Sequence, residues 1–485
     1  MAKSRKRKLV GIDDAVNNGG IDRLPDDLVI NILSHMSMKR AVRTSVLAHR
    51  WRYLWSFSHE ILRFDGKLME KEKFESWVNG VLDHLHQGRY IEGMIISFEG
   101  GVGMDETAST SRAVEKWLNF AMQKEVQRLE LNLSFEDIYR YKCPGFRYAF
   151  PTLDELRSHS PSRSRAFCRL RSLRLAHVQI SHDVVHYFLA SCPDLEELCI
   201  RLSYYIQGDL RVVDPPSLRV LEITRCPYIA SLEISAVSLV SLKYGGAKNS
   251  LLLKKAPNLR KLCVRGGMCW SFVLEPKEHS SYSVQLEKLV LDFRLPEDFR
   301  ISVYAPPDSP RLCSLKRLQV QVLTKHGSSL NFFKSLIVAS PHLCEFRIEL
   351  SYTVDVNESN LYGFPDIKEV YKVGKFVHRN LKVVEMSGYI GCGGHGEKLL
   401  VELIWSCPSL ERVAIDTLTD YYDDPLVRSY IAACRSYKDF VVPWATSREE
   451  AKERAQRFIA KTRKQKPRMR EWKRCQWERL EFIVT

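Results

Sequence analysis

The feature that most constrains the fold is a short apolar motif that returns through the middle of the chain. Each copy has a leucine or similar residue at its first and fourth positions and another apolar residue at its sixth. Copies begin at Val126, Leu170, Leu195, Leu218, Leu259, Leu286, Leu315, Leu343, Leu381 and Leu410. Most of them lie 23 to 29 residues apart. The gaps after Val126 and Leu218 are longer, and the long gap between Leu343 and Leu381 contains an insertion. Repetition at this interval predicts stacked supersecondary units, each burying its apolar face against the next.

Several copies follow a helical apolar pattern and a tight turn. The segments VVHYFLASCP, FFKSLIVASP and KLLVELIWSCP place apolar residues at helical spacing and end on a small residue and proline. Helix, turn and strand then alternate as they do in leucine-rich repeats. Shorter copies at Ile229 and Leu239 leave room for a strand and a turn but for no helix. We therefore predict an α/β fold, a curved leucine-rich-repeat solenoid with parallel strands inside and helices or turns outside.

Composition and cysteine usage narrow the class of protein. Hydrophobic residues make up 45% of the chain and charged residues 27%, which is ordinary for a soluble globular protein. No apolar run approaches the ~18 residues of a membrane span, and the N-terminus lacks the apolar core of a secretory signal. The 13 cysteines form no CxxC pair, which predicts reduced thiols in a nuclear or cytoplasmic protein. Cys192 and Cys407 share a repeat position with Ala256 and Ser340, so we expect packing residues there.

The positive charge is concentrated at the two ends of the chain. The net charge is +15, of which residues 3–8 supply five basic side chains. Residues 448–479 hold 13 basic and 5 acidic side chains, so the two ends together supply +13. The nearly neutral body does not resemble a nucleic-acid-binding surface. Residues 3–8 are consistent with a nuclear import signal and equally with a solvated basic tail.

The C-terminal segment from Arg448 begins as a charged helix with a thin apolar stripe. The stripe consists of Ala451, Ala455, Phe458 and Ile459. We expect this helix to cap the last repeat, because the end of a solenoid needs a polar outer cover. The alternative is contact with RNA or DNA through the basic residues together with Trp472 and Trp477.

Residues 22–57 predict a small helical unit with more apolar surface than it can bury. Pro25 suits a first helical turn, and Asp26 and Asp27 suit the positive end of the helix dipole. The apolar residues that follow cover a wide arc of each helix, which predicts a partner surface.

The same segment resembles a known domain. The motifs LPDDL, IL, AVRTSVL and RWRYLW occur in the order found in plant F-box domains, over roughly residues 21–60. The chain departs from the common plant F-box pattern at two places. It has His49 where many members have lysine, and Met36-Ser37 where many have Leu-Pro. Neither change introduces a buried charge.

The resemblance implies a three-helix hook that binds the Skp-type adaptor of a cullin-based (SCF) ubiquitin ligase. Carried over by position, the adaptor contacts would be Leu24, Pro25, Leu28, Ile32, Leu33, Val46, Leu47, Trp51 and Leu54. Residues on the last helix remain open to a role in the internal core. Through the adaptor, the resemblance also implies a cullin and a RING subunit as partners.

A second resemblance lies near the C-terminus. Residues 380–416 read as a strand LKVVEMSG, a glycine-containing loop, a helix and a P-x-LE strand. This order is similar to the FBD region that follows leucine-rich repeats in many plant F-box proteins. The chain is therefore identified as a member of the plant F-box/FBD/LRR-repeat family. The expected domains are a basic tail (1–20), the F-box (21–60), a linker or irregular repeat (61–120), leucine-rich repeats (121–375), the FBD-like region (376–418) and a C-terminal cap with a basic helical tail (419–485).

Several sequence patterns resemble catalytic or metal-binding motifs but are better interpreted as structural features. Gly391 to Gly396 matches GxGxxG, with Asp416 downstream, but no second mononucleotide-binding half is visible and loop glycines are preferred. His182 and His186 are four residues apart without a third ligand, and Cys392-x-x-His395 has no partner pair. No GxSxG, P-loop or kinase motif occurs. We expect no catalytic residue, metal or cofactor.

A target protein would meet the strand residues between the leucines, which face the concave surface. These are Arg174, Glu197, Glu222, Lys261, Lys288, Gln319, Arg347, Glu385 and Arg412. Both charge signs occur, so a polar protein or peptide is a more natural ligand than a polyanion. Together with this surface, the resemblance to plant F-box proteins implies a non-catalytic substrate receptor of an SCF ubiquitin ligase with an unidentified target. The alternatives are a non-degradative scaffold, a nucleic-acid-binding protein acting through its basic ends, and an enzyme using the glycine loop.

Overall fold

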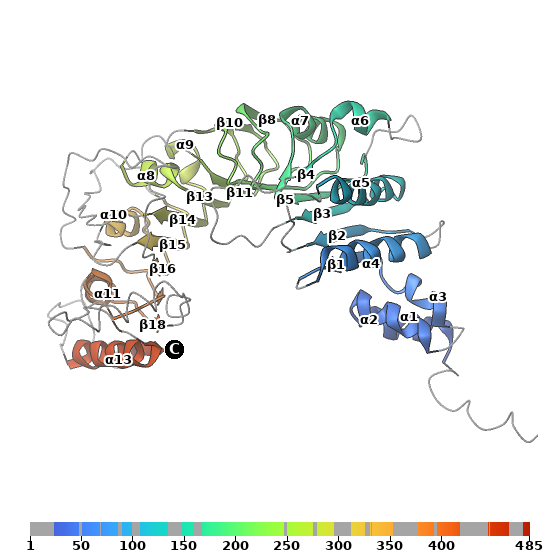
Figure 1. Ribbon diagram of the computed structural model, residues 1–485. Helices are drawn as coiled ribbons and strands as arrows, with labels where there is room; N and C mark the ends of the chain where they lie inside the picture. Colours follow the sequence, from blue (N-terminus) through green and yellow to red (C-terminus); the bar gives the residue numbers. More distant parts are fainter. Residues whose placement is uncertain are drawn as a thin grey trace, which may run out of the picture. The chain divides into compact units, whose positions relative to one another are not determined.

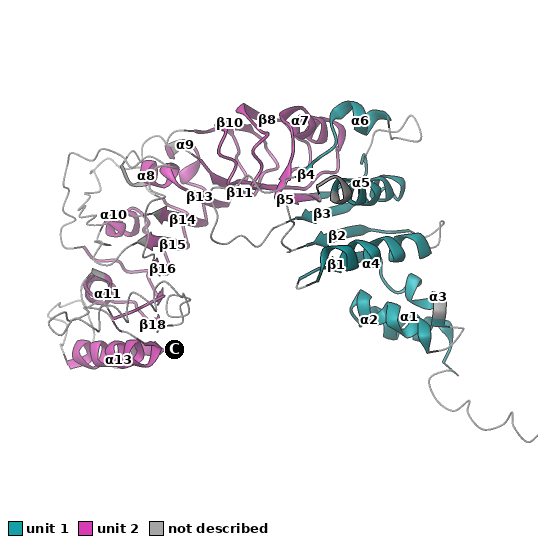
Figure 2. Cartoon of the chain, in the orientation of Figure 1, with its two compact units in different colours: residues 1–172 teal, residues 173–485 magenta. Residues whose placement is uncertain are grey.

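The structure is a computed structural model in which the chain forms two compact units, residues 1–172 and 173–485 (Figure 2). It describes residues 24–47, 51–67, 69–85, 90–98, 107–133, 148–158, 167–246, 250–274, 279–294, 312–324, 330, 332–352, 376–391, 395–417, 445, 447–464 and 479–485.

Unit 1 begins with a small helical bundle (Figure 1). Its elements are α1 (Asp26–Ser34), α2 (Met38–Arg43), η2 (Thr44–Val46), α3 (Trp51–Leu54) and η3 (Trp55–Phe57). Pro25 opens α1, and its carbonyl accepts from the amides of Leu28 and Val29 at 3.1 and 3.2 Å. Because proline has no N–H of its own, it loses nothing at this position. Buried Val29 and Ala41 form the centre of the bundle.

Three strands and two long helices follow in unit 1. They are β1 (Ile61–Asp65), α4 (Lys71–His84), β2 (Gly93–Ser97), α5 (Thr107–Gln123) and β3 (Arg128–Asn132), with β4 (Tyr148–Ala149) and α6 (Leu153–Ser158) after them. The strands pair in parallel in the order β1-β2-β3. Buried Phe74 contacts Phe98, Trp77 and Trp117 with ring centroids 5.0–6.0 Å apart. Residues 61–120, expected as a linker or irregular repeat, thus contain regular strand–helix units.

Neighbouring strands of the main sheet of unit 2 pair in parallel from Glu197 to Val484. Its strands are β5 (Ser172–Ala176), β7 (Glu197–Arg201), β9 (Val220–Thr224), β11 (Ser241–Gly245), β13 (Lys261–Arg265), β14 (Lys288–Arg294), β15 (Arg317–Thr324), β16 (Glu345–Tyr352), β17 (Val383–Ser387), β18 (Arg412–Asp416) and β19 (Glu481–Val484), paired in that order. The strands therefore lie in the sheet in the same order as in the chain, and the strands skipped between β5 and β19 belong to other, smaller sheets. This order confirms the predicted parallel-strand leucine-rich-repeat architecture.

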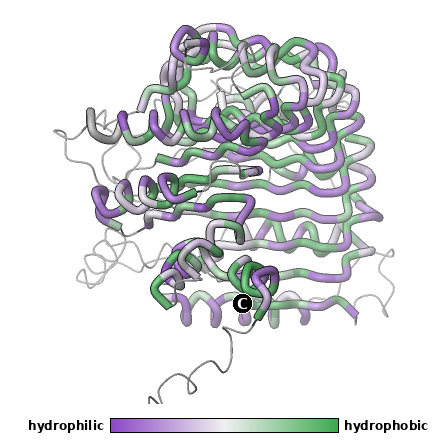
Figure 3. Tube along the Cα trace, turned by 90° about the vertical axis from the view of Figure 1, so that its right-hand side faces the viewer, coloured by the Kyte–Doolittle hydropathy of each residue, from purple (hydrophilic) through white to green (hydrophobic). Residues whose placement is uncertain are grey.

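The register of the main sheet explains the sequence motif. The second residue of one strand pairs with the second residue of the next, through Leu198, Leu221, Leu242, Leu262, Leu289, Leu318, Phe346, Val384 and Val413. All of these side chains are almost completely buried. In Figure 3 the strands are stacked rungs along which hydrophobic and hydrophilic residues alternate. Because strand side chains alternate between faces, the buried ladder leaves the first, third and fifth residues on the opposite face.

Helices and a second sheet form the outer layer of unit 2. The helices are α7 (His182–Ser191), α8 (Gly267–Leu274), α9 (Ser280–Ser283), α10 (Phe333–Val338) and α11 (His395–Ser406). The second sheet has the order β12 (Leu251–Lys255), β10 (Ile229–Ser235), β8 (Gly208–Val213), and a further short strand, β6 (Val178–Gln179), precedes α7. Figure 1 shows β8 and β10 on the side of the main sheet where α7 lies.

The two short motif copies belong to different sheets. The copy at Ile229 forms β10 of the second sheet, whereas the copy at Leu239 forms β11 of the main sheet. The connections from β9 to β11 and from β11 to β13 are shorter than those that hold α7 and α11, and each contains a strand of the second sheet. The predicted absence of a helix is thus confirmed for these copies.

The C-terminal segment adds one more strand to the main sheet. Helix α13 (Arg448–Lys464) buries Ala451, Ala455, Phe458 and Ile459, the predicted apolar stripe. Strand β19 then pairs with β18 in parallel, and the Thr417 amide donates to the Thr485 carbonyl at 3.0 Å. The sequence pattern did not predict β19, because it lacks the motif leucines. Trp472 and Trp477 lie outside the described residues.

Gly388 offers a test of the packing between neighbouring repeats. Its φ is +72°, and a Cβ there would lie 1.9 Å from the Leu350 carbonyl oxygen. Gly208 has a φ of +75° but no atom within 4 Å of an added Cβ. We expect Gly208→Ala to lower the free energy of unfolding by about 1 kcal/mol, the cost of a left-handed alanine. Gly388→Ala carries that cost and the steric overlap, so we expect a loss of more than about 2 kcal/mol.

Denaturant unfolding of the two variants and the wild type measures this difference. Both substitutions lie in unit 2, so the transition of that unit is compared in each case. Equal losses for the two variants would contradict the close approach of Gly388 to Leu350.

Candidate functional site

The helical bundle of unit 1 carries a concentration of exposed apolar side chains. Of the fifteen large apolar side chains exposed in the described part of the chain, six lie between Leu28 and Phe57. These six are Leu28, Met36, Val46, Leu47, Tyr53 and Phe57, and we call them the apolar face. Val46 and Leu47 are 85% and 68% exposed, respectively. Such a concentration on a small unit is typical of a protein-binding surface.

The structure divides the nine predicted adaptor contacts into two groups. Pro25, Leu28, Val46 and Leu47 are exposed, and Leu24 and Ile32 are partly exposed. These six remain predicted contacts.

Leu33, Trp51 and Leu54 are buried in the bundle. For Trp51 and Leu54, on the last helix, burial agrees with the alternative of a role in the internal core, whereas the assignment of Leu33 to a binding surface needs correction. Trp51 and Leu54 lie on α3, and their side chains help to fill the core that Val29 centres. The sequence pattern also missed Met36, Tyr53 and Phe57. Helical spacing alone does not show which residues of a wide apolar arc face the bundle core and which face solvent.

The nine predicted target contacts all lie on the polar face of the main sheet of unit 2. Each is the first or third residue of its strand, opposite in direction to the buried ladder. Those at the first position are Glu197, Lys261, Lys288 and Arg412, and those at the third are Arg174, Glu222, Gln319, Arg347 and Glu385. We call this surface the polar sheet face.

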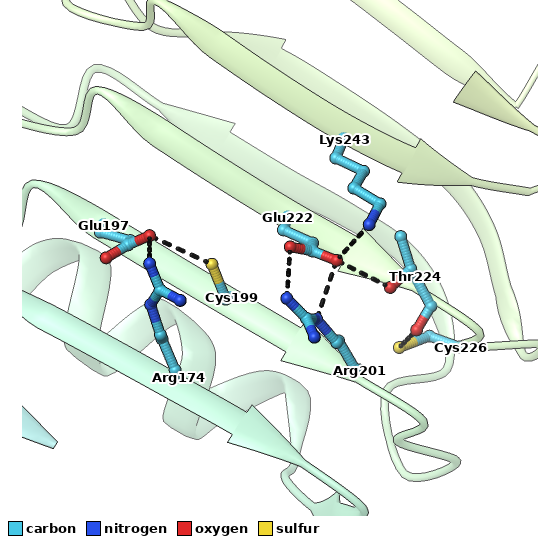
Figure 4. A network of polar contacts seen from close by, with 8 residues as sticks. All are labelled: Arg174, Glu197, Cys199, Arg201, Glu222, Thr224, Cys226 and Lys243. Atoms are coloured by element: carbon cyan, nitrogen blue, oxygen red, sulfur yellow. Dashed lines mark hydrogen bonds and ion pairs between the residues drawn. The ribbon is translucent and has the colours of Figure 1, made fainter. Parts of the chain in front are cut away.

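Glu222 is the most buried charged residue of the polar sheet face, and Figure 4 shows the polar side chains that contact it. Its carboxylate accepts from Arg201 Nε and Nη2 at 2.9 and 3.1 Å, and it lies 3.1 Å from Lys243 Nζ. Thr224 Oγ1 also donates to it at 3.3 Å. Burial acts to raise the pKa of Glu222, but the hydrogen bonds from Arg201 and Lys243 outweigh burial and hold the pKa below its ordinary value.

Two further ion-paired groups flank this cluster along the sheet. Arg174 Nη2 lies 2.6 Å from Glu197 Oε1, joining β5 to β7. Near the other end, Glu385 receives Arg347 Nε at 3.1 Å and Arg412 Nη2 at 2.9 Å, joining β16, β17 and β18. Six of the nine predicted target contacts are therefore already tied to neighbouring strands. These six side chains brace the sheet as well as presenting charge.

The sequence pattern missed other members of the polar sheet face. Arg201, Arg265 and Asp292 occupy the fifth strand position, and Lys243 occupies a third position. Arg265 Nε and Asp292 Oδ2 are 2.5 Å apart across β13 and β14. Extending the motif by one residue beyond its last apolar position would have found the fifth-position residues.

Cysteines on and near the sheet are held as protonated thiols. Burial raises the pKa of Cys199 to about 12 and that of Cys263 to about 11. Cys192 and Cys407 are buried, as the repeat position predicted, and burial raises the pKa of Cys407 to about 12. A thiol of this kind is a poor nucleophile and a poor metal ligand at neutral pH.

The first glycine of the GxGxxG segment (Gly391 to Gly396) contacts the C-terminal helix α13. Gly391 has a φ of +68°, and its carbonyl accepts from Arg454 Nη1 of α13 at 2.8 Å. A Cβ at Gly391 would lie 2.5 Å from Arg454 Cδ, so glycine is needed for this contact. Residues 392–394, including Cys392, lie outside the described residues.

The histidine pair on α7 is a ring contact. The rings of His182 and His186 are 4.5 Å apart, and burial, followed by the neighbouring His182, lowers the pKa of His186. Within the described ranges, no three His, Cys, Asp or Glu side chains are grouped so that they could hold a metal ion. Among the same residues, no helix has the length and apolar character needed to cross a membrane.

Comparison with known proteins matches two family models to the chain. The model described as "At1g61320/AtMIF1, LRR domain" matches residues 86–462, and the model described as "F-box domain" matches residues 21–60. The first of these spans most of the chain and includes every strand from β2 to β18.

Relatives from Arabidopsis thaliana carry both names. The chain is 29% identical over 225 residues to F-box/LRR-repeat protein At3g03360, an alignment covering 44% of this chain and 42% of that protein. It is 30% identical over 261 residues to F-box/LRR-repeat protein At3g26922, covering 51% and 82%, respectively. It is 27% identical over 351 residues to F-box/FBD/LRR-repeat protein At1g13570, covering 68% and 76%. The chain therefore spans less than half the length of the first of these relatives.

Substitution of Glu222 tests the role of its cluster in holding the sheet together. We expect Glu222→Gln to lower the free energy of unfolding by about 1–2 kcal/mol at pH 7, because two charge-assisted interactions are lost. The folded pKa of Glu222 is depressed, so its contribution is complete above the unfolded pKa of about 4.3 and is lost as the pH falls below it. The gap between wild type and variant should narrow over that acidic range.

The matched control is Glu349→Gln on the same sheet. Glu349 is exposed and accepts a hydrogen bond from Gln321 Nε2 at 2.8 Å. Its substitution should change the free energy of unfolding by less than about 0.5 kcal/mol. Denaturant unfolding at pH 7 and pH 4 measures both variants. An equal loss for both would mean that Glu222 contributes no more than a surface carboxylate.

Proposed function

Because the chain belongs to the family of F-box proteins with leucine-rich repeats, we propose that it is the substrate-recognition subunit of an SCF-type (Skp–cullin–F-box) ubiquitin ligase. In this role the F-box binds a Skp-type adaptor and, through it, the cullin and RING subunits. The leucine-rich repeats bind the target protein. The observation that carries the proposal is the apolar face of residues 28–57, which coincides with the matched F-box.

The apolar face supports adaptor binding on physical grounds. Burying a leucine or valine side chain contributes about 1.5–3 kcal/mol, so burial of several side chains of the apolar face is sufficient for a stable complex. The side chains are held in place by a bundle whose own core is filled by Leu33, Trp51 and Leu54. A preformed apolar surface loses little conformational entropy on binding.

The polar sheet face supports target binding in unit 2. Its side chains come from successive parallel strands, and ion pairs across those strands fix many of their positions. A receptor of this kind needs no catalytic group of its own. It raises the effective concentration of target lysines near the activated ubiquitin, which other subunits carry.

A nucleic-acid-binding role has weaker support from the described basic residues. Two arginines of α13 have partners inside the protein. Arg454 lies 2.7 Å from Glu450 and binds the Gly391 carbonyl, and the Arg463 guanidinium lies 4.9 Å from the centre of the Phe482 ring. These contacts serve the C-terminal cap rather than an open basic surface.

Co-purification with a plant Skp-type adaptor tests the adaptor surface. We expect the wild-type chain to retain the adaptor and the double variant Val46→Glu/Leu47→Glu to bind it at least about 100-fold more weakly, because two apolar contacts become charged. Both residues are highly exposed, so the bundle should remain folded. Titration of purified adaptor gives the affinities.

The matched control is Val213→Glu/Leu252→Glu in the second sheet of unit 2. These side chains are 59% and 48% exposed and lie outside the F-box. The control should bind the adaptor like wild type. Loss of binding in both double variants, or in neither, would overturn the assignment of the apolar face. A scaffold that does not direct ubiquitination would bind the adaptor but yield no ubiquitin transfer when cullin, RING and conjugating enzyme are added.

A further inference from the structure

Three adjacent strands place cations at the same position of the polar sheet face. The first residues of β13, β14 and β15 are Lys261, Lys288 and Arg317. The register pairs Lys261 with Lys288, and Lys288 with Arg317. Neighbouring strands are about 4.8 Å apart, so the three side chains stand side by side. We call them the cationic row.

The cationic row has no acidic partner within the described part of the chain. None of its three side chains takes part in an ion pair or a side-chain hydrogen bond there. Two acids adjoin the row, Glu287 immediately before Lys288 in the chain and Glu345 opposite Arg317 on β16, and both are engaged elsewhere. Glu287 lies 3.3 Å from Arg260 and 3.8 Å from Lys316, and Glu345 is paired with Arg347.

Like charges on neighbouring strands destabilise a sheet. The rest of the polar sheet face avoids this cost, since Arg174, Arg201, Arg265 and Arg412 each have an acid on a neighbouring strand. The third position beside the cationic row is also neutral, with Cys263, Val290 and Gln319. Glu345 on β16 stands opposite Arg317 but is paired with Arg347, so no ion pair within the described sheet relieves the repulsion along the row. Carboxylates from a ligand would relieve it.

The width of the row limits the kind of anion it fits. The unpaired charge spans three strands, or about 10 Å between the outer two. On either side lie clusters that contain acids, around Glu222 and around Glu385. A long polyanion continuing past the row would meet these carboxylates. A short acidic segment of a protein would not.

We propose that the cationic row binds a short acidic peptide segment of the target protein, with Asp or Glu carboxylates meeting Lys261, Lys288 and Arg317. This inference rests on the proposed function, in which the polar sheet face holds the target. It adds the chemistry of the recognised segment. The neutral third position beneath the row leaves room for a small or apolar side chain between the acids.

The test uses the full chain and a fluorescein-labelled ten-residue peptide that contains four Glu residues. A second peptide has Gln at the same four positions. We expect the Glu peptide to bind, more weakly as salt rises, and the Gln peptide to bind at least tenfold more weakly. The variant Lys261→Gln/Lys288→Gln/Arg317→Gln should lose at least tenfold in affinity for the Glu peptide. Fluorescence anisotropy measures each titration.

The matched control removes the same charge from other exposed positions of unit 2. It is Lys255→Gln/Arg379→Gln/Lys398→Gln, with Lys255 on β12, Lys398 on α11 and Arg379 in the segment before β17. The control should bind the Glu peptide within about twofold of wild type, since screened charges at a distance contribute little. The row variant should be at least as stable as wild type in denaturant unfolding, because its substitutions remove repulsion.

Three results would overturn the inference. One is equal binding of the Glu and Gln peptides, or binding of neither. Another is an equal loss in the control and row variants. A third is displacement of the Glu peptide by single-stranded DNA at lower concentration than by the unlabelled peptide, which would identify a nucleic-acid surface. Adaptor binding in the same preparation shows whether the proposed function stands when the inference fails.

Discussion

The structure of unit 2 depends on one in-register ladder of apolar side chains. From Leu198 to Val413 the second residue of each strand meets its equivalent on the next strand and is almost completely buried. A slip of one residue in any pair would turn the buried set outward, so the ladder specifies the register strongly. The opposite face is then free to carry polar residues, because the pleat decides which side chains reach it.

The register of the ladder also creates the ion pairs of the polar sheet face. Arg201 and Glu222 are 21 residues apart in the chain and meet on neighbouring strands. Glu385 meets two arginines in the same way. A face braced by such pairs presents charge at fixed positions, and the cationic row stands out because it lacks them. The apolar face of unit 1 is a separate surface with a different composition, suited to a different partner.

Much of this organisation was predictable from the sequence. The motif gave the strands of unit 2, and the two-residue period of a strand placed all nine predicted target contacts on one face. The ion pairs were not predictable, because they depend on register across more than 20 residues. Strands β1, β2 and β19 were missed because β1 and β19 have His59 and Arg479 at the first motif position, and β2 has Ile91 and Met94 where the motif has leucines. In the F-box, helical spacing could not separate buried Trp51 and Leu54 from exposed Val46 and Leu47, since all four belong to one wide apolar arc.

The central claim is that adaptor and target use different surfaces in different units of one chain. Amide hydrogen exchange of the full chain, with and without a plant Skp-type adaptor, tests it most directly, since binding slows local opening of the contacted segment. The account predicts slower exchange within residues 26–57 and unchanged exchange in β13, β14 and β15. Unchanged exchange in residues 26–57, or protection of those three strands by the adaptor, would contradict it.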